Sequence, residues 1–355
     1  MDEIKILGLA LYGPQAASHR VRLGQYVTGL RRVGIDLQIH SLLDDAYVAK
    51  RFAGARASAS DFFTNVWSRV KLLLDSDRFD MAIVHCELLP LFPAWVERRL
   101  IKIPYIYDFD DAFFLRYRVG RLSRLEFFLG SKFDSFVSGA AAITAGNQFL
   151  ADYALRHGRN VTLLPSVVDT SIFRPLALSD RRDTFTVGWI GSPSTAIYLR
   201  QLVDPLAQLA TKCPIRFVVV GGAAPSIPGV EVVELPWSSS TEVAVINSFD
   251  VGVMPLNDDE WARGKCAFKL IQYMACGVPV IASRVGANVD VVKPDCGLLT
   301  DGPESWVPAL RLMLHDRPLR TQMSEACRRR VVESYSLELM VPKLADVIRS
   351  VGSAR

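Results

Sequence analysis

The sequence predicts an α/β protein of two domains, each with a parallel sheet covered by helices. Short apolar runs alternate with helix-like segments through most of the chain, which is typical of βαβ units. This alternation begins twice, at residue 4 and again at residue 185. The 355 residues suit two domains of ordinary size, and 50% of them are hydrophobic, so two cores can be buried.

Composition and charge exclude several classes of protein. A formal net charge of +4 is too small to indicate a nucleic-acid partner. The six cysteines are scattered without C-x-x-C spacing, so we expect buried thiols and neither a disulfide framework nor a zinc site. Asp2, Glu3 and Lys5 precede only a short strand, so we expect no signal peptide. No apolar run reaches the ~20 residues that span a bilayer. A cytoplasmic protein fits these observations best.

The first half of the chain opens with a βαβ unit. Strands are expected at 4–11, 35–39, 79–84, 103–107, 141–145 and 161–164. Helices are expected at 18–33, 62–74, 92–99 and 150–155. A parallel sheet of this kind binds ligands at the carboxyl ends of its strands. Ser18, Arg20 and Arg22 lie at that edge. Because the two arginines are two residues apart, one can face a ligand while the other is solvated.

Three carboxylates follow the strand at 103–107, at the edge where such a sheet binds its ligand. They are Asp108, Asp110 and Asp111. Mutual repulsion should raise the pKa of at least one of them, which suits a group that accepts a proton. The alternative is an acidic helix start that only stabilises the helix dipole.

Residues 113–133 interleave aromatic and basic side chains and contain a single acid, Glu126. This composition is typical of a helix that lies in a membrane interface, and it would suit an enzyme with a lipid-linked acceptor. The alternative is a pair of helices packed on the first domain with their arginines in water.

The second half repeats the βαβ pattern. Strands are expected at 185–190, 215–220, 230–235, 251–256 and 280–282. Helices are expected from 195 to about 210 and at 241–249, 268–275, 304–315, 317–333 and 337–351. Gly191, Ser192, Ser194 and Thr195 form the turn after the first of these strands. Small residues at such a turn let a phosphate reach the backbone N–H groups, although a capped helix without a ligand would look the same.

A cation-rich stretch precedes and enters the helix at 268–275. It contains Arg263, Lys265 and Lys269, and Gly277 ends the helix because glycine accepts a left-handed turn cheaply. Cations at a helix start beside a glycine turn suit a phosphorylated ligand. The alternative is an ordinary helix–turn–strand unit of a doubly wound domain.

The string FKLIQYMACGVPV at 268–280 resembles the sequence FKLLQYMAxGxPVV of a subgroup of the family-four retaining glycosyltransferases. Further resemblances to this subgroup are ASHRVR at 17–22, PSVVD at 165–169 and GWIGSPSTAIYL at 188–199. The family has the GT-B fold, in which two Rossmann-like domains with parallel sheets face each other across a cleft. The resemblance implies an acceptor domain over 1–175, a linker over about 176–184, a nucleotide-sugar domain over 184–335 and a final helix over 336–355 that crosses back to the first domain.

This resemblance implies the transfer of a hexosyl unit from a UDP- or GDP-linked sugar with retention of the anomeric configuration. The partners would be the nucleotide sugar and a glycan, lipid-linked or small-molecule acceptor. The enzyme would work in the cytoplasm, and at the inner face of the membrane if 113–133 binds lipid. Enzymes of this fold usually need no metal, so we expect no metal and no cofactor.

The resemblance also implies donor-binding residues. Gln272 stands where a glutamate of the family holds the donor ribose, and it can hydrogen-bond a ribose without being an anion. Ile197 and Tyr198 stand near the positions of the family's diphosphate clamp. We therefore assign the clamp to Lys265 or Lys269, helped by Ser194 and Thr195, and we count Arg263 among the donor-binding residues.

Three further assignments follow. The carboxylates at 108–111 match the family's D-x-H-E, with Asp110 in place of the histidine, and would orient the acceptor or accept its proton. Gly264 stands where the family's other glutamate lies near the transferred sugar, so that role has no residue. Trp237 lies in the loop that approaches the nucleotide base, although a packed side chain is the commoner role of such a tryptophan.

Two other classes of function remain open. A nucleotide-sugar 2-epimerase would share the fold and the diphosphate site and would need no acceptor. A non-catalytic protein that binds a nucleotide sugar and activates another transferase would tolerate the missing glutamates. Nucleotide release and acceptor-dependent product, measured together, separate these classes from a transferase.

Overall fold

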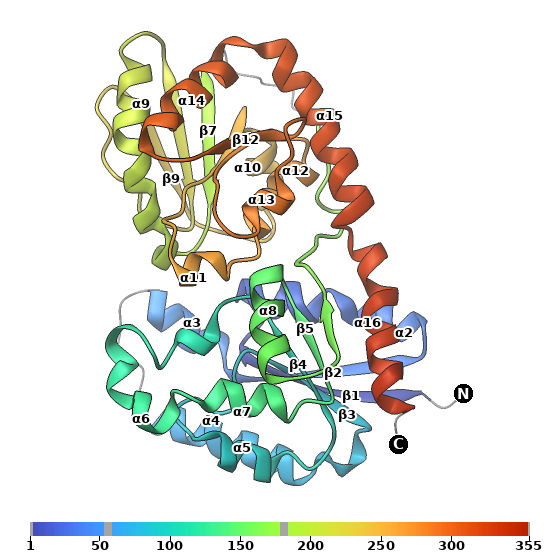
Figure 1. Cartoon of the computed structure of the whole chain (residues 1–355). Helices are drawn as coiled ribbons and strands as arrows, with labels where there is room; N and C mark the ends of the chain where they lie inside the picture. The colour runs from blue at the N-terminus through green and yellow to red at the C-terminus, as the bar shows by residue number, and fades with distance from the viewer. Residues whose placement is uncertain (1–2, 53–58, 178–183, 354–355) are drawn as a thin grey trace. The chain divides into compact units, whose positions relative to one another are not determined.

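The chain forms two compact units in the computed structural model, which describes residues 3–52, 59–177 and 184–353 (Figure 1). The first unit contains the chain up to Ser166, the short segment Gly264–Cys266 and the chain from Leu337 onward. The second unit contains Val167–Arg263 and Ala267–Ser336. Within the described ranges each unit has one six-stranded sheet whose paired strands are parallel, so the predicted α/β fold class is confirmed.

The sheet of the first unit has the strand order β2-β1-β3-β4-β5-β6. Its strands are β1 (Ile4–Tyr12), β2 (Ile35–Leu43), β3 (Met81–His85), β4 (Tyr105–Phe109), β5 (Ala142–Ala145) and β6 (Val161–Leu163). Every residue of β3, β4 and β5 is buried, as expected for apolar strands of a parallel sheet with helices on its faces. The chain order reverses between β1 and β3, so the carboxyl edge beside these strands is the expected ligand position.

The helices of the first unit include one from the far end of the chain. They are α1 (Ala17–His19), α2 (Tyr26–Arg32), α3 (Asp45–Phe52), α4 (Ala59–Leu74), α5 (Ala94–Leu100), α6 (Glu126–Leu129), α7 (Lys132–Ser138), α8 (Gln148–His157) and α16 (Leu337–Gly352). Gly29 explains how α16 packs on α2, because a Cβ atom there would lie 2.6 Å from Val341. Arg349 on α16 also donates to the carbonyl oxygen of Val33 at 3.0 Å.

The helix expected from Ser18 to Gly34 is interrupted. The short α1 is followed by a π-helical turn at Arg20–Gly24, in which the N–H of Gln25 bonds to the carbonyl oxygen of Arg20 at 2.9 Å. Ser18 does not cap this region, since the residue before α1 is Ala16 and makes no side-chain capping bond. A π turn widens the helix and is frequent at functional sites. Arg22 lies in this turn and is buried.

The sheet of the second unit has the order β12-β11-β10-β7-β8-β9. Its strands are β7 (Phe185–Ile190), β8 (Ile215–Val220), β9 (Glu231–Leu235), β10 (Val251–Met254), β11 (Val280–Ser283) and β12 (Gly297–Thr300). Its α-helices are α9 (Val203–Ala210), α10 (Glu242–Asn247), α11 (Glu260–Arg263), α12 (Phe268–Ala275), α13 (Asn288–Val291), α14 (Trp306–His315) and α15 (Arg317–Ser334). The core cluster of this unit contains the aromatic side chains Phe185, Trp189, Phe217 and Trp306. The sequence missed β12, and a 3₁₀ helix at Pro193–Leu202 stands where a helix of the α type was expected before α9.

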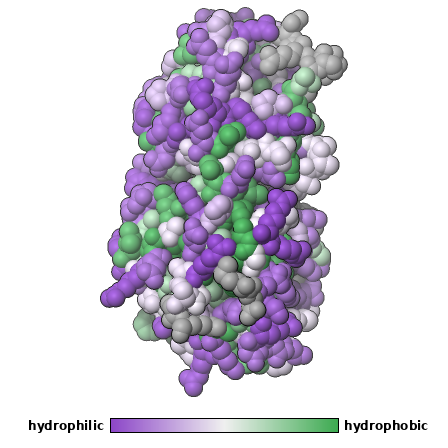
Figure 2. Space-filling model, turned by 90° about the vertical axis from the view of Figure 1, so that its right-hand side faces the viewer, coloured by the Kyte–Doolittle hydropathy of each residue, from purple (hydrophilic) through white to green (hydrophobic). Residues whose placement is uncertain are grey.

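Most residues of α15 lie on the surface of the second unit. Its buried residues are Met323, Ala326, Cys327 and Val331. Hydrophilic side chains cover most of the upper part of Figure 2, which views the molecule from the side that carries α15. The helix therefore contributes a narrow apolar stripe to the core and leaves its remaining residues in water.

The division between the units falls earlier than the sequence suggested. Residues 167–175 were assigned to the first domain but cluster with the second unit. Val168 forms a parallel bridge with Ser336, and Arg328 of α15 donates to the carbonyl oxygens of Thr170 and Phe173 at 2.8 and 2.6 Å. These bonds tie the segment to the end of α15. Most of the expected linker, residues 178–183, lies outside the described residues.

Candidate active site

Three neighbouring strands of the first unit carry polar side chains in one row. In the sheet register His85 of β3 pairs with Asp108 of β4, and Asp108 pairs with Thr144 of β5. Paired residues of parallel strands point to the same face, so these side chains meet at the carboxyl edge of the sheet. All three are buried.

Asp108 is the centre of this row. Arg22 donates from Nε to Oδ2 at 3.0 Å and from Nη2 to Oδ1 at 2.5 Å. Thr144 Oγ1 donates to Oδ1 at 2.6 Å, and His85 Nδ1 lies 2.8 Å from Oδ2. Burial alone would raise the pKa of Asp108, but the charge of Arg22 and hydrogen bonds from His85 and Arg22 hold that pKa well below its usual value. We therefore interpret Asp108 as an ionised residue that holds its neighbours in place, whereas the sequence had suggested a proton acceptor.

The structure separates the two arginines that the sequence placed at this edge. Arg22 is 2% exposed and binds Asp108 through two nitrogens. Burial would lower the pKa of Arg22, but the charge of Asp108 raises it overall, so the arginine stays protonated. Arg20 instead donates from Nη1 to two backbone carbonyls of the loop before α1. Ser18, the third residue assigned to the acceptor side, is half-buried on α1.

His85 is a functional candidate that the sequence analysis did not single out. Its Nδ1 atom must donate to Asp108, because an ionised carboxylate can only accept. The other ring nitrogen, Nε2, lies 3.0 Å from Sγ of Cys86 and 3.7 Å from Oδ1 of Asp110. Asp110 is the more accessible partner, with a side chain 18% exposed against 1% for His85. The sequence feature that could have identified His85 is its place at the end of β3, the strand before the one that carries Asp108.

His85, Cys86 and Asp110 are also the one group of three, in the described part of the chain, whose donor atoms lie close enough for a shared metal ion, within 4.8 Å of one another. A metal-bound cysteine is a thiolate. Burial first, and the charges of Asp110 and Asp108 next, raise the pKa of the Cys86 thiol well above its usual value. Without a bound cation the thiol therefore keeps its proton and lies beside Nε2 as a hydrogen-bonded side chain.

Asp111, the third carboxylate after β4, lies beside Lys265. Oδ1 of Asp111 and Nζ of Lys265 are 3.4 Å apart. The next residue, Cys266, places its Sγ 3.1 Å from the carbonyl oxygen of Asp110. These contacts explain why Gly264–Cys266 clusters with the first unit. Lys265 and Lys269, the two candidates for a diphosphate clamp, thus fall in different units.

A second buried network of charges involves the basic segment 113–133. Lys132 donates to Glu87 at 2.6 Å and lies 3.1 Å from Glu97. Arg116 lies 2.9 Å from the other oxygen of Glu87. Burial raises the pKa of Glu97 to about 8 although Lys132 opposes this shift. Lys132 is therefore a buried cation and Arg116 a partly buried one, and both are paired with acids of the first unit.

The exposed part of this segment is smaller than the sequence suggested. Arg118 is tied to Asp134 at 2.6 Å, whereas Phe127 and Phe128 are 91% and 73% exposed. Two exposed arginines, Arg121 and Arg124, precede these phenylalanines. We name residues 119–128 the basic-aromatic tip. The membrane contact that was predicted for all of 113–133 is now proposed for this tip alone. In the described ranges no helix combines the length and the apolar character that a membrane span requires.

The second unit brings predicted donor-binding residues together where β7 ends. Nζ of Lys269 lies 3.1 Å from Oγ1 of Thr195 and 4.5 Å from the centre of the Trp189 ring. A Cβ atom at Gly191 would lie 2.6 Å from the same Nζ, so a glycine is needed for Lys269 to reach the turn. A cation and a hydroxyl beside a glycine turn suit an anion such as a phosphate.

Gln272 and Trp237 meet at a carboxylate that the sequence analysis overlooked. Glu242 of α10 accepts at Oε2 from Nε1 of Trp237 at 3.0 Å and from Nε2 of Gln272 at 3.3 Å. Glu242 is 8% exposed and Gln272 is 5% exposed. The helix α10 thus places the carboxylate of Glu242 beside Gln272, whose own side chain is an amide. No periodicity or motif links residues 242 and 272, so only the tertiary structure could show this pair.

The remaining predicted donor residues lie nearer the surface of the second unit. The hydroxyls of Ser192 and Ser194 lie 2.9 Å apart in the turn after β7. Arg263 ends α11 and binds Asp258 through Nε at 2.7 Å. Both side chains of this ion pair are exposed, so it contributes little to stability.

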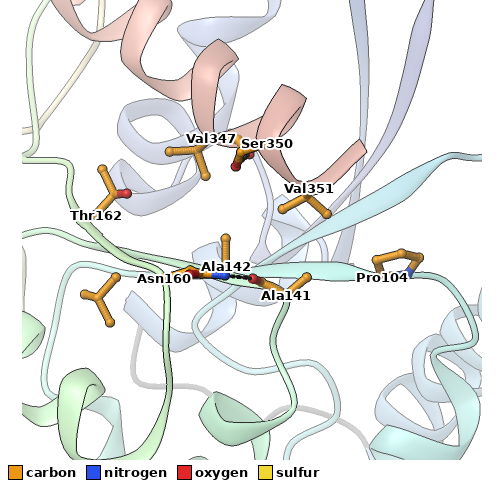
Figure 3. A pocket seen from close by; sticks show the side chains of 9 residues that line it. Pro104, Ala141, Ala142, Asn160, Thr162, Val347, Ser350 and Val351 are labelled. Atoms are coloured by element: carbon orange, nitrogen blue, oxygen red, sulfur yellow. Dashed lines mark hydrogen bonds between the residues drawn. The ribbon is translucent and has the colours of Figure 1, made fainter. Parts of the chain in front are cut away.

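A cavity of about 480 Å³ lies at the opposite edge of the first unit (Figure 3). It is lined by Pro104, Ala141, Ala142, Asn160, Val161, Thr162, Val347, Ser350 and Val351. These residues come from the amino ends of β4, β5 and β6 and from α16, and none of them has a charged side chain. The cavity therefore lacks the groups that catalysis needs, and the carboxyl edges remain the candidate sites.

Comparison with known proteins shows what the chain is similar to in sequence. Residues 184–316 match the family described as "Glycosyl transferases group 1". A GDP-mannose-dependent monoacylated alpha-(1-6)-phosphatidylinositol monomannoside mannosyltransferase of Corynebacterium glutamicum is 34% identical over 82 residues. That match covers 22% of this chain and 22% of the mannosyltransferase.

Solved structures share the fold over nearly the whole chain. Sucrose-phosphate synthase of Thermosynechococcus elongatus has a TM-score of 0.76 at 16% identity, covering 99% of this chain and 100% of that one. Anabaena HepE in complex with UDP-glucose has a TM-score of 0.74 at 15% identity, covering 98% and 100%. The chain therefore has the GT-B type of fold, and its residues 184–316 match the group 1 glycosyltransferase family.

Proposed function

We propose that the chain is a glycosyltransferase that moves a hexosyl unit from a UDP- or GDP-linked sugar to a glycan, lipid-linked or small-molecule acceptor. Transfer would retain the anomeric configuration and use no metal or other cofactor. The observation that carries the proposal is the position of Lys269 at the glycine turn after β7, inside the region that matches the group 1 glycosyltransferases.

The donor would be bound by the second unit. Lys269 would neutralise the negative charge that grows on the departing diphosphate, and the backbone N–H groups of the turn at 191–195 would add donors. The ribose hydroxyls would bind Gln272 and Glu242, which already share a hydrogen bond. The carboxylate accepts from a hydroxyl and the amide can do either, so the pair suits a diol.

The acceptor would be activated by the first unit. Asp108 is ionised and occupied by four contacts, and Asp111 lies beside Lys265, so we assign the role of proton acceptor to Asp110, which is partly exposed next to His85. In the proposed step the acceptor oxygen bonds to the anomeric carbon on the same face from which the diphosphate leaves, so the configuration is retained, and the acceptor's proton moves to Asp110. The bond from that carbon to the diphosphate breaks, and its electron pair leaves with the diphosphate.

The names of two similar proteins guide the choice of substrates. The mannosyltransferase uses GDP-mannose and a phosphatidylinositol mannoside, and HepE was solved with UDP-glucose. GDP-mannose and UDP-glucose are therefore the first donors to test. The exposed basic-aromatic tip favours a lipid-linked acceptor, with the enzyme at the cytoplasmic face of a membrane.

The decisive experiment incubates the protein with each donor, with and without lipid-linked and soluble acceptors. Nucleotide release that depends on the acceptor, together with a glycosylated product of retained configuration, supports the proposal. Interconversion of the nucleotide sugar without an acceptor indicates an epimerase. Donor binding by calorimetry without turnover indicates a non-catalytic partner. Removal of divalent metal with a chelator should leave the rate unchanged, and a lost rate would contradict metal-independent transfer.

A further inference from the structure

We propose that Tyr273 is a positioning residue for the donor diphosphate, which holds the glycine turn after β7 in place against Lys269. This inference rests on the proposed function and adds to it a residue to which neither the motifs nor the comparisons give a role. Its basis is a hydrogen bond of 2.8 Å from the backbone N–H of Ile190 to the hydroxyl oxygen of Tyr273. Tyr273 is 0% exposed, so it cannot touch a nucleotide and must act through this bond.

The strand β7 leaves one of its two neighbours just before the turn. Its pairing with β10 ends at Gly188, whereas its pairing with β8 continues to Ile190. Successive N–H groups of a strand point to opposite sides, and that of Gly191 bonds to the carbonyl oxygen of Val220 in β8 at 3.0 Å. The N–H of Ile190 therefore points to the β10 side, beyond the end of that pairing. A buried N–H needs an acceptor, and the hydroxyl of Tyr273 supplies it.

The ring of Tyr273 is fixed by the residues that it packs against. A Cβ atom at Gly252 of β10 would clash with the ring, so the helix α12 brings this side chain directly over the backbone of the strand. The ring of Phe249 packs edge to face against it, with 6.1 Å between the ring centres. The hydroxyl is thus held at one place beside the end of β7, and a glycine at 252 is required for it to lie there.

Lys269 lies one helical turn before Tyr273 on the same face of α12, because residues four apart in a helix are neighbours. Its Nζ atom lies 3.1 Å from Oγ1 of Thr195, at the far end of the turn. One helix therefore contacts the turn at both ends, through Tyr273 at Ile190 and through Lys269 at Thr195. A diphosphate that binds both Lys269 and the N–H groups of the turn needs a fixed distance between them, and the bond to Tyr273 maintains it.

The first test compares nucleoside diphosphates with monophosphates. In Tyr273→Phe the N–H of Ile190 loses its acceptor, and the turn is no longer held against Lys269. We expect the Kd of UDP or GDP, measured by calorimetry, to rise about 5-fold, the equivalent of about one hydrogen bond. The Kd of UMP or GMP should stay within about 2-fold, because these ligands lack the outer phosphate that Lys269 would hold. Equal weakening of both kinds of nucleotide, or of neither, overturns the proposal.

The control is Tyr105→Phe, the same chemical change at a buried tyrosine of the first unit, whose hydroxyl donates to the carbonyl oxygen of Phe136 at 2.6 Å. It should lower the stability measured by thermal unfolding and leave every Kd unchanged. An equal loss of diphosphate affinity in this control would show that the effect comes from general destabilisation, and would overturn the proposal.

A double variant tests whether Tyr273 acts through Lys269. Once Lys269→Ala has removed the cation, Tyr273→Phe should weaken diphosphate binding by less than about 2-fold, because side chains that act on the same ligand group are not additive. A further loss of about 5-fold in the double variant would show that the two residues act independently, and would overturn the proposal.

The last test does not depend on nucleotide binding. The amide of Ile190 should exchange its hydrogen slowly in the wild type and faster in Tyr273→Phe, by a larger factor than the amide of Val219 in β8, which reports on the stability of the sheet. Equal factors at the two amides overturn the role of Tyr273 even in a protein that binds nucleotides. If instead the wild type binds none of the nucleotides, the proposed donor site fails, and this inference fails with it, whatever the exchange rates are.

Discussion

The two units place charge in different ways at the carboxyl edges of their sheets. In the first unit, Arg22, Asp108 and His85 are buried and bind one another. In the second unit, Lys269 lies against a hydroxyl and an aromatic face beside a glycine. The first arrangement fixes the geometry of charged groups before any ligand arrives, and the second suits a ligand that brings its own negative charge. Mutations in the first should act on stability and in the second on affinity.

The largest expected effect is therefore on the stability of the first unit. Arg22→Ala would leave Asp108 ionised and buried without its cation, which should lower the free energy of unfolding by about 3–5 kcal/mol. Urea unfolding measures this loss. The matched control is Arg20→Ala, two residues away, whose guanidinium donates to the backbone carbonyls of Pro14 and Gln15 in a surface loop. An equal loss of unfolding free energy in the two variants would show that the buried ion pair contributes no more to stability than the contacts of Arg20.

The next effect concerns donor affinity in the second unit. Lys269→Ala should weaken binding of UDP or GDP by about 1.5–3 kcal/mol, because a phosphate would lose a charge-assisted hydrogen bond. Calorimetry with each nucleotide measures the loss, and stability should change little. Lys212→Ala is the control, since Lys212 is an exposed lysine before the amino end of β8. Affinity unchanged in Lys269→Ala would remove the basis for the proposed donor site.

How much of this arrangement the sequence could predict differs between the two edges. Both parallel sheets follow from apolar runs, and Gly191 and Lys269 follow from a turn and a cation at a helix start. The pairing of His85 with Asp108 does not, because it depends on the register of β3 and β4. Local sequence sets where a strand runs, whereas its partner and register come from the packed sheet.

Two further features lay beyond the sequence for the same reason. Glu242 and Gln272 are brought together by the packing of α10 near α12, and no spacing links them. The inward direction of Arg22 depends on the π-helical turn at 20–24, which a regular period of 3.6 residues does not predict. Lys265 looked equivalent to Lys269, but the chain between them leaves one unit for the other.

A pH experiment tests whether the second buried network also behaves as a fixed part of the first unit. Burial raises the pKa of Glu97 from 4.5 to about 8, against the charge of Lys132. The folded state keeps a proton that the unfolded chain loses above pH 4.5, so this stabilisation is complete below that pH and disappears as pH rises through about 8. The free energy of unfolding should fall by up to about 1.4 kcal/mol per pH unit in this window. Glu97→Gln cannot lose a proton, so its stability relative to the wild type should rise with pH, and parallel curves would contradict the assigned shift.

The smallest expected effect is on vesicle binding, and it distinguishes arginines of the segment 113–133 that are paired with acids from an exposed one. Arg116 and Arg118 are tied to Glu87 and Asp134, whereas Arg121 lies in the exposed basic-aromatic tip. Arg121→Gln should weaken binding to vesicles with anionic lipids by about 1 kcal/mol without loss of stability, because each cation near such a surface contributes about that much. Arg99→Gln, an exposed arginine on α5, is the control and should bind like the wild type. If both variants sediment with vesicles equally well, the tip is an ordinary solvated surface and the acceptor need not be lipid-linked.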